Sequence, residues 1–90
     1  MRFKYQLPDE WLSKAAELEE FANGAMQVSI RLNDDRVVRN VLISNSTNIV
    51  ATRGHKDLPF ALEEIVDIFQ TDEDRNPTIR GGWEFWDKWE

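Results

Sequence analysis

The sequence predicts a mainly β protein of the α+β class: an N-terminal helix, a small and strongly bent antiparallel β-barrel, and an aromatic C-terminal tail. Three observations support this: an apolar stripe at helical spacing near the N-terminus, alternating apolar and polar residues in the middle, and three tryptophans within the last eight residues. A length of 90 residues with 41% hydrophobic residues suits one domain that buries a core. We therefore expect a single domain over residues 1–90, divided into a helix at 8–23, the barrel at 25–70 and an acidic, Trp-rich tail at 71–90.

The N-terminal helix is predicted over residues 8–23. Pro8 suits the first helical position, because its missing N–H would have no partner there. Two acidic residues follow it, where negative charge meets the positive end of the helix dipole. Apolar residues then recur at spacings of four and three along one face: Trp11, Ala15, Leu18 and Ala22. Asn23-Gly24 is a good stop, and we expect the helix to cap one open end of the barrel with Trp11 as its main anchor.

The first barrel strand and its turn are predicted over residues 27–35. Apolar side chains alternate with polar ones in the strand, which places three of them on one sheet face: Val28, Ile30 and Leu32. Asn33, Asp34 and Asp35 follow. Because Asn and Asp tolerate positive φ and bond their own backbone, these residues suit a tight hairpin turn.

Further strands follow this turn. Residues 37–43 are apolar at both odd and even positions, which is typical of a strand that is buried on both faces or bent to serve two halves of a barrel. A polar turn at 44–48 leads into a third strand at 49–52. The segment 58–70 fits either a helix or a strand by its apolar spacing, and we expect a strand at 65–70.

The stretch from Val28 to Ala51 resembles the first motif of the Sm-like family of small SH3-type β-barrels. That motif runs apolar-x-apolar-basic-Leu-x-Asp-Gly-Arg and continues into a strand. It is matched here, in order, by Val28, Ile30, Arg31, Leu32, Asp34 and Arg36, then by Val38, Leu42 and Ser44. The chain departs from the family at Asp35 and Asn40, which stand where glycine is usual, and at Ser46, where Asp is common. The resemblance covers about a quarter of the chain and implies a helix-capped SH3-type barrel whose short strands pair between subunits in rings.

The resemblance also implies candidate RNA-binding residues. In the family, a loop that ends in Asn and the Arg-Gly of a second motif line the ring pore and hold bases. Carried onto this chain, these positions are Asn48, Asn45, Arg80 and Gly81, and Ile79-Arg80-Gly81 has the letters that open the second motif. A single-stranded RNA-binding oligomer is therefore one function that the resemblance implies.

The net charge of −6 is unevenly distributed along the chain. Residues 25–56 carry five basic and two acidic groups, a net +3, whereas residues 57–90 carry three basic and ten acidic groups, a net −7. The acidic total argues against tight non-specific binding to nucleic acid. The acidic C-terminal region also suggests an alternative, an inhibitor or immunity-type protein that blocks a basic partner.

The tail gathers aromatic residues in an acidic context: Trp83, Phe85, Trp86 and Trp89. An aromatic side chain buries on the order of 150–250 Å² when packed, so four of them are costly to leave in water. Either the tail folds back over this domain's own core, or it docks on another chain. Because tryptophan dominates interface hot spots, the second alternative makes these four residues candidates for partner binding.

Catalysis is not expected. The chain has no cysteine and one histidine, His55, which excludes thiolate chemistry and His-based metal clusters. No glycine-rich phosphate loop and no nucleophile elbow is present. We expect no enzyme activity, no cofactor and no bound metal.

Location and function follow as expectations. No apolar run is long enough to span a membrane, and the N-terminus lacks the apolar core of a signal peptide, so we expect a cytoplasmic protein without membrane contact. The sequence favours a non-enzymatic protein-interaction or self-assembly module that forms a homo-oligomer. RNA binding and acidic inhibition are the two alternatives.

Overall fold

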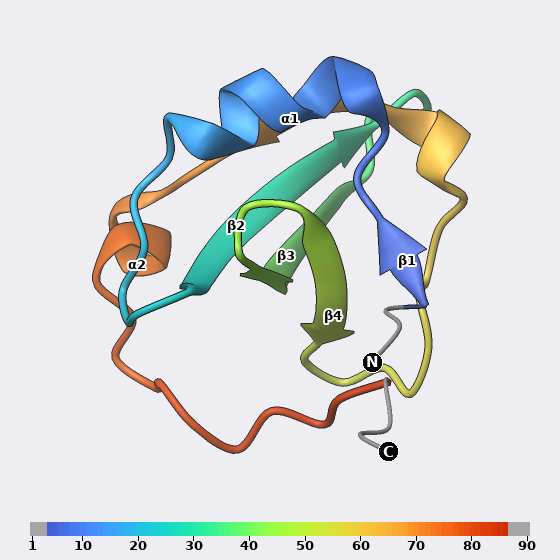
Figure 1. The fold of residues 1–90 in the computed structure, drawn as a ribbon. Coiled ribbons are helices and arrows are strands. Elements are labelled where there is room, and N and C mark those ends of the chain that lie inside the picture. Colours follow the sequence, from blue (N-terminus) through green and yellow to red (C-terminus); the bar gives the residue numbers. More distant parts are fainter. Residues whose placement is uncertain (1–3, 87–90) are drawn as a thin grey trace.

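The computed structural model describes residues 4–86. The elements, in chain order, are β1 Tyr5–Gln6, α1 Asp9–Ala16, β2 Ala25–Leu32, β3 Val37–Ser44, β4 Asn48–Thr52, the 3₁₀ helix η1 Leu62–Glu64, β5 Ile65–Phe69 and α2 Asp72–Arg75. The five strands form one curled antiparallel sheet in the order β1-β4-β3-β2-β5, a half-barrel with α1 across one end (Figure 1). The predicted α+β class and the bent antiparallel sheet are confirmed. No helix within the described residues is long and apolar enough to cross a lipid bilayer.

Helix α1 is half as long as predicted. Pro8 lies just before its first residue, but the helix ends at Ala16 instead of near Asn23. The cause is Gln70, whose side chain accepts a hydrogen bond from the backbone N–H of Glu19 and donates one to the carbonyl of Glu19. These bonds replace helical partners for Glu19, so the chain after α1 is held beside the end of β5.

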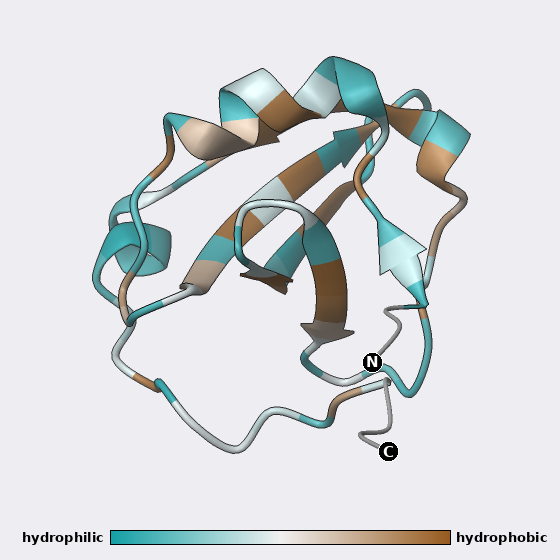
Figure 2. Cartoon of the chain, in the orientation of Figure 1, coloured by the Kyte–Doolittle hydropathy of each residue, from teal (hydrophilic) through white to brown (hydrophobic). Residues whose placement is uncertain are grey.

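The main core lies on one face of the curled sheet. It is built from the alternating residues of the predicted first strand together with residues of the other strands: Met26, Val28, Ile30, Leu32, Val41, Ile43, Ile49, Ile65 and Ile68. Trp11 and Leu18 of the N-terminal region pack against it, and Ala15 is fully buried. Figure 2 shows the hydrophobic bands along β2 and β3 and the hydrophilic colour of α2.

A second, smaller cluster lies on the opposite sheet face. Leu42, Val50 and Ala51 are buried there, with Phe21 and Trp83 packed against them. Strand β3 therefore contributes to both clusters, because Val41 and Ile43 face the main core and Leu42 faces the second. Of the two predicted alternatives, a strand buried on both faces or a bent strand, burial on both faces holds for the second half of β3, Val41–Ile43, whereas Val37 and Arg39 in its first half are exposed.

Four non-glycine residues of the sheet region have positive φ, three in the turns between strands and Asn40 within β3: Asp35, Asn40, Asn45 and Ser46. Asp35 has φ 70° in the turn between β2 and β3, and Asn40 has φ 58° where the β2–β3 register shifts. Asn45 and Ser46, with φ of 54° and 59°, form the central pair of a type I′ turn closed by a bond from Thr47 N to Ser44 O of 3.1 Å. Asp35 and Asn40 thus adopt the backbone conformation that glycine would adopt at these two positions.

The ambiguous segment after β4 ends as a strand. The 3₁₀ helix η1 leads into β5, which pairs with β2, so the predicted strand at 65–70 is confirmed as Ile65–Phe69. The two-residue strand β1, which pairs Tyr5 with Ile49, was not predicted. Two residues are too few to produce a periodic pattern, so a strand of this length has no signal in the sequence.

Candidate functional site

The C-terminal segment crosses the molecule to the free edge of β4. Residues 76–86 contain no helix or strand. They run from α2 past the end of β4 (Figure 1). The described part of the aromatic tail therefore folds back over its own domain, the first of the two alternatives that the sequence left open.

Trp86 holds the tail to β4. Strand β1 pairs with Asn48 and Ile49, and beyond Ile49 no other strand of the described residues pairs with this edge of β4, where only His55 forms a bridge to Thr52. The backbone N–H of Trp86 donates to the carbonyl of Val50 at 3.1 Å. Its indole meets the ring of Tyr5 edge-on, with centroids 5.5 Å apart and an interplanar angle of 89°, and its Nε1 lies 3.4 Å from the carbonyl oxygen of His55.

Trp83 is the second anchor. Its ring packs on the cluster of Leu42, Val50 and Ala51, and the guanidinium carbon of Arg53 lies 4.0 Å from the ring centroid. Such a cation–π contact contributes about 0.5–2 kcal/mol, more when water is excluded. Arg53 also donates to the carbonyls of Gly81 and Gly82, so one side chain of the basic segment contacts three residues of the tail. We call Tyr5, Leu42, Val50, Ala51 and Arg53 the tail-binding surface.

The predicted partner-binding residues divide into two groups. Trp83 and Trp86 face the domain and are partly buried. Phe85 is 52% exposed, and Ile79 in the same segment is 63% exposed. Trp89 lies outside the described residues. The tail thus uses two tryptophans as internal anchors and presents two other large apolar side chains to solvent.

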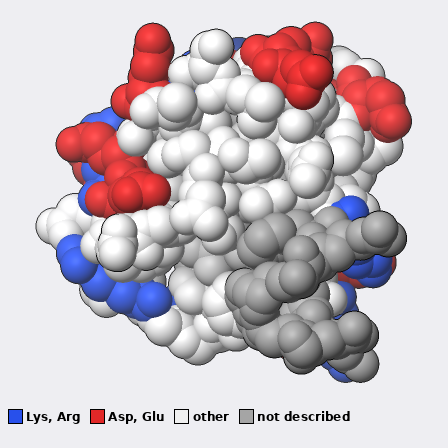
Figure 3. Space-filling view, viewed as in Figure 1, with Lys and Arg blue, Asp and Glu red and all other residues white. Residues whose placement is uncertain are grey.

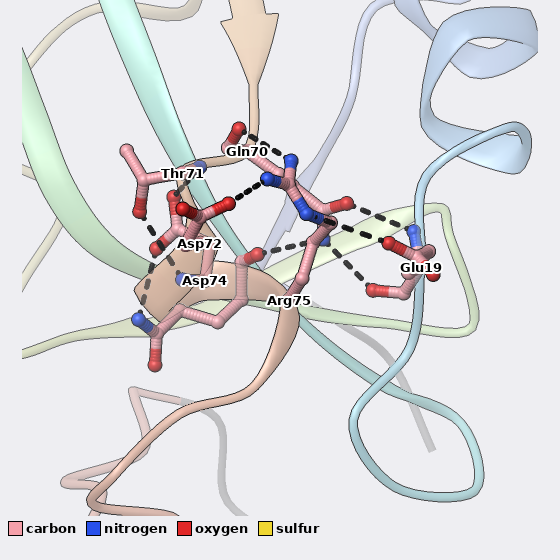
Figure 4. A network of polar contacts seen from close by, with 7 residues as sticks. Glu19, Gln70, Thr71, Asp72, Asp74 and Arg75 are labelled. Atoms are coloured by element: carbon pink, nitrogen blue, oxygen red, sulfur yellow. Dashed lines mark hydrogen bonds and ion pairs between the residues drawn. The ribbon is translucent and has the colours of Figure 1, made fainter.

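A buried carboxylate fixes the point from which the tail starts. Asp74 of α2 is 2% exposed, and it accepts hydrogen bonds from Gln27 Nε2 at 2.9 Å, Ser29 Oγ at 2.8 Å and Thr71 N at 2.9 Å. Asp74 N in turn lies 3.2 Å from Thr71 Oγ1, which completes a capping box. Figure 4 shows this polar junction and the contacts beside it that involve Glu19, Gln70, Asp72 and Arg75.

The polar junction was missed by the sequence analysis, which assigned residues 71–90 to a tail. Two signals were present. Thr71-x-x-Asp74 is a capping box pattern, and Gln27 and Ser29 are the polar positions of the first strand. The strand pattern identifies residues that share a face, but it does not indicate that α2 covers this face.

The four candidate RNA-binding residues do not come together within one chain. Asn45 is exposed in the type I′ turn, and Asn48 is 7% exposed, with an Oδ1 atom that has no hydrogen-bond partner among residues 4–86. Arg80 donates to Asn76 Oδ1 and to the carbonyl of Pro77, and the carbonyl of Gly81 accepts from Arg53. Asn48 and Arg53 lie five residues apart along β4 and its end, about 16 Å at the usual strand rise.

Two hollows lie elsewhere on the surface. An acidic groove of about 730 Å³ separates the start of α1 from η1 and is lined by Gln6, Pro8, Asp9, Glu10, Leu62 and Glu63. Figure 3 shows acidic side chains over these two elements.

A smaller cavity of about 170 Å³ lies beside the polar junction, lined by Gln27, Asn40, Arg53, Glu73, Thr78 and Ile79. Both oxygens of Glu73 accept bonds from Thr78, so that carboxylate is already used within the chain.

Asp57 ties the N-terminal strand to the loop after β4. Its carboxylate accepts from the hydroxyl of Tyr5 at 2.7 Å, from Leu58 N at 2.8 Å and from Lys4 Nζ at 3.2 Å. The Tyr5 bond is the largest of the causes that hold the pKa of Asp57 below its ordinary value, and the same bond raises the pKa of Tyr5. Since Tyr5 also contacts Trp86, this carboxylate supports one wall of the tail-binding surface.

This arrangement predicts that acid weakens the support of Tyr5. Because the folded-state pKa of Asp57 is depressed, its contribution to stability is complete above the unfolded-state pKa and is lost as the pH falls through the folded-state value. Stability measured by urea unfolding from about pH 6 to pH 3 should therefore decline less steeply in Asp57→Asn than in the wild type. A Tyr5→Phe variant keeps the ring against Trp86 but loses the hydrogen bond to Asp57. Its stability should therefore also decline less steeply with falling pH than that of the wild type, though by a smaller difference than in Asp57→Asn. Identical slopes for all three proteins would contradict the assignment.

The chain was compared with protein-family models, curated proteins and solved structures. No family model matches the chain, and neither a curated protein nor a solved structure matches it.

Proposed function

We propose that this chain is a non-enzymatic interaction module that assembles with further copies of itself, and that the tail and the β4 edge form the contact. The observation that carries the proposal is the outward face of the tail. Ile79 and Phe85 are two of the four large hydrophobic residues that are well exposed in the described residues, and both lie on a segment that is itself docked on an open strand edge. Exposed aromatic and apolar side chains on a fixed support are typical of interaction surfaces.

The charge distribution favours a second copy as the partner. Residues 25–56, which form most of the sheet, carry a net +3, and residues 57–90, which include the tail, carry a net −7. A head-to-tail arrangement would therefore bring the acidic region of one copy to the basic region of the next.

The two alternatives have less support. For RNA binding, the side chain of Asn48 lies inside the sheet and the guanidinium groups of Arg53 and Arg80 are already engaged by the chain's own carbonyls. Single-stranded RNA needs accessible stacking surfaces together with positive charge. For acidic inhibition, the groove between α1 and η1 supplies negative charge, and this alternative stays a prediction.

The proposal is tested by the mass of the protein in solution. Light scattering after size exclusion should give a mass above that of one chain, rising with concentration. Replacing both Ile79 and Phe85 with serine should raise the dissociation constant at least about tenfold, the equivalent of 1.4 kcal/mol. Both side chains are exposed, so the circular dichroism spectrum and the melting temperature should stay close to the wild type.

Val66→Ser is the matched control. Val66 is 47% exposed on the edge strand β5, at the opposite end of the sheet from β4, and its replacement removes an exposed apolar side chain that is not on the tail. We expect the wild-type mass for this variant. A wild-type protein that stays monomeric at every concentration, or a double variant that assembles as well as the wild type, would refute the proposal.

A further inference from the structure

We infer that the tail-binding surface is a peptide-binding site whose occupant in the assembly is the tail of a second copy of this chain. This inference rests on the proposed self-assembly and adds its mechanism: tails are exchanged between copies. Within one chain the tail already engages the surface as a peptide ligand would. It supplies a main-chain hydrogen bond to the unfinished edge of β4, an indole over an apolar cluster, and an indole edge-on to Tyr5.

The contacts of the tail are transferable because they are concentrated at its far end. Pro77 is buried next to α2, but each of the next five residues, 78–82, is exposed. The anchors Trp83 and Trp86 come only after this connection. Redirecting the tail therefore requires a change in an exposed connection and not in the core.

The connection contains the residues that such a change needs. Gly81 and Gly82 are adjacent, and Gly82 has φ 72°, a conformation that glycine adopts without steric cost. A methyl group added at Gly81 would meet no atom of the described residues within 4 Å, so its Cα side is not closely packed. A hinge of this kind lets the segment after residue 82 leave its own domain, the usual route to exchange of an identical element between protomers.

Exchange can restore the contacts of the two tryptophan anchors, because the second copy offers the same surface, whereas the bonds from Arg53 to the carbonyls of Gly81 and Gly82 lie at the hinge itself. The bond from Trp86 N to Val50 O, the stacking of Arg53 on Trp83 and the Tyr5 contact can each form between two chains as they form within one. Within one chain the two partners have a high effective concentration, so the intramolecular form dominates in dilute solution. At higher concentration the exchanged form gains any surface that Ile79 and Phe85 bury between copies.

Two full-length variants test the exchange by complementation. The variant Trp83→Ala/Trp86→Ala has a tail without anchors and an intact tail-binding surface. The variant Arg53→Glu has an intact tail, but the new carboxylate on its tail-binding surface repels the acidic tail. Each variant alone should be mainly monomeric in native mass spectrometry. A mixture should form a heterocomplex, because the wild-type tail of the Arg53→Glu chain can occupy the intact surface of the other variant.

The outcomes separate the two proposals. If the wild type assembles and the mixture forms no more complex than either variant alone, tail exchange is wrong and self-assembly by another contact stands. If the wild type does not assemble, the proposed function itself is wrong. Circular dichroism of each variant verifies that it is folded before mixing.

A competition experiment on the wild-type protein gives the same answer without any variant of the domain. A synthetic peptide with the sequence of residues 79–90, added in excess, should occupy the surface and reduce the mass to that of one chain with one peptide. The control is the same peptide with alanine in place of Trp83 and Trp86, which should leave the assembly intact. An assembly that is unchanged by the first peptide, or equally dissociated by both, would overturn tail exchange.

Discussion

Replacing Asp74 with alanine should lower the free energy of unfolding by about 3–5 kcal/mol, one of the two largest effects that we expect for a polar side chain in this protein. The carboxylate is 2% exposed and is the acceptor for Gln27, Ser29 and Thr71. Removing it leaves the hydroxyl of Ser29 and the N–H of Thr71 without their acceptor. Gln27 loses one of its two acceptors and keeps the bond to Asn40. A buried donor without a partner costs about 1–3 kcal/mol.

An effect of this size is a large part of the stability of a domain of 90 residues. At roughly 0.05–0.15 kcal/mol per residue, such domains have about 5–13 kcal/mol in total. Urea unfolding, followed by far-UV circular dichroism as well as by tryptophan fluorescence, measures the change. The tail starts from α2, so loss of the junction should also loosen the tail. The fluorescence of Trp83 and Trp86 should report this loosening.

Asp72→Ala is the matched control on the same helix. The side chain of Asp72 is 99% exposed and forms an ion pair with Arg75, so we expect a change within about 1 kcal/mol. Ser29→Ala removes a single donor of the junction and should have an intermediate effect. Equal stability of Asp74→Ala and Asp72→Ala would show that the junction does not hold α2 on the sheet.

The sequence predicted the sheet well because its pattern follows from burial on one face. Val28, Ile30 and Leu32 had to share a face, and the odd and even apolar positions of β3 had to be covered on both sides. These inferences depend only on the period of two in a strand, so they hold without knowledge of the partners.

The same pattern does not determine whether the polar positions in β2 are buried. Gln27 and Ser29 look like residues of a solvent-facing side, yet they are 2% and 0% exposed because α2 covers them. Whether a polar face is covered depends on a contact with residues about 45 positions away, and no local pattern encodes it. The end of α1 was misjudged for a related reason, since Gln70, far along the chain, takes over the backbone groups of Glu19.

The candidate site was predictable only in part. The aromatic cluster of the tail was evident from composition, but the division into inward Trp83 and Trp86 and outward Phe85 depends on where the β4 edge is left open by the two-residue strand β1. Arg53 was recognised as part of a basic segment. Its actual role, a contact with Trp83 and two tail carbonyls, arises from the return of the chain over the sheet.

The backbone bend at Asn40 leads to the second prediction. Asn40 has φ 58° within β3, opposite the point where the pairing shifts from Val28–Val41 to Ile30–Val38. Asn40→Val should destabilise the protein by about 2–3 kcal/mol, because a β-branched residue is strained by about 1–2 kcal/mol in this region and about 1 kcal/mol is lost with the hydrogen bond from Gln27 Nε2. Asn40→Gly loses the same hydrogen bond but has no strain, so its change should stay within about 1 kcal/mol.

The neighbouring position provides the control for this second prediction. Arg39 is exposed in the same strand with no positive φ, so Arg39→Val should change stability by no more than about 0.5 kcal/mol. Equal stability of the valine and glycine variants at position 40 would contradict the role of the left-handed backbone.

The two sites should also be coupled to each other. Gln27 bonds to both Asn40 and Asp74, so the changes in stability caused by Asn40→Val and Asp74→Ala should not be additive. A double variant that matches the sum of the two single changes would mean that the bulge in β3 and the docking of α2 are independent, whereas a departure of about 0.5 kcal/mol or more would link them through Gln27.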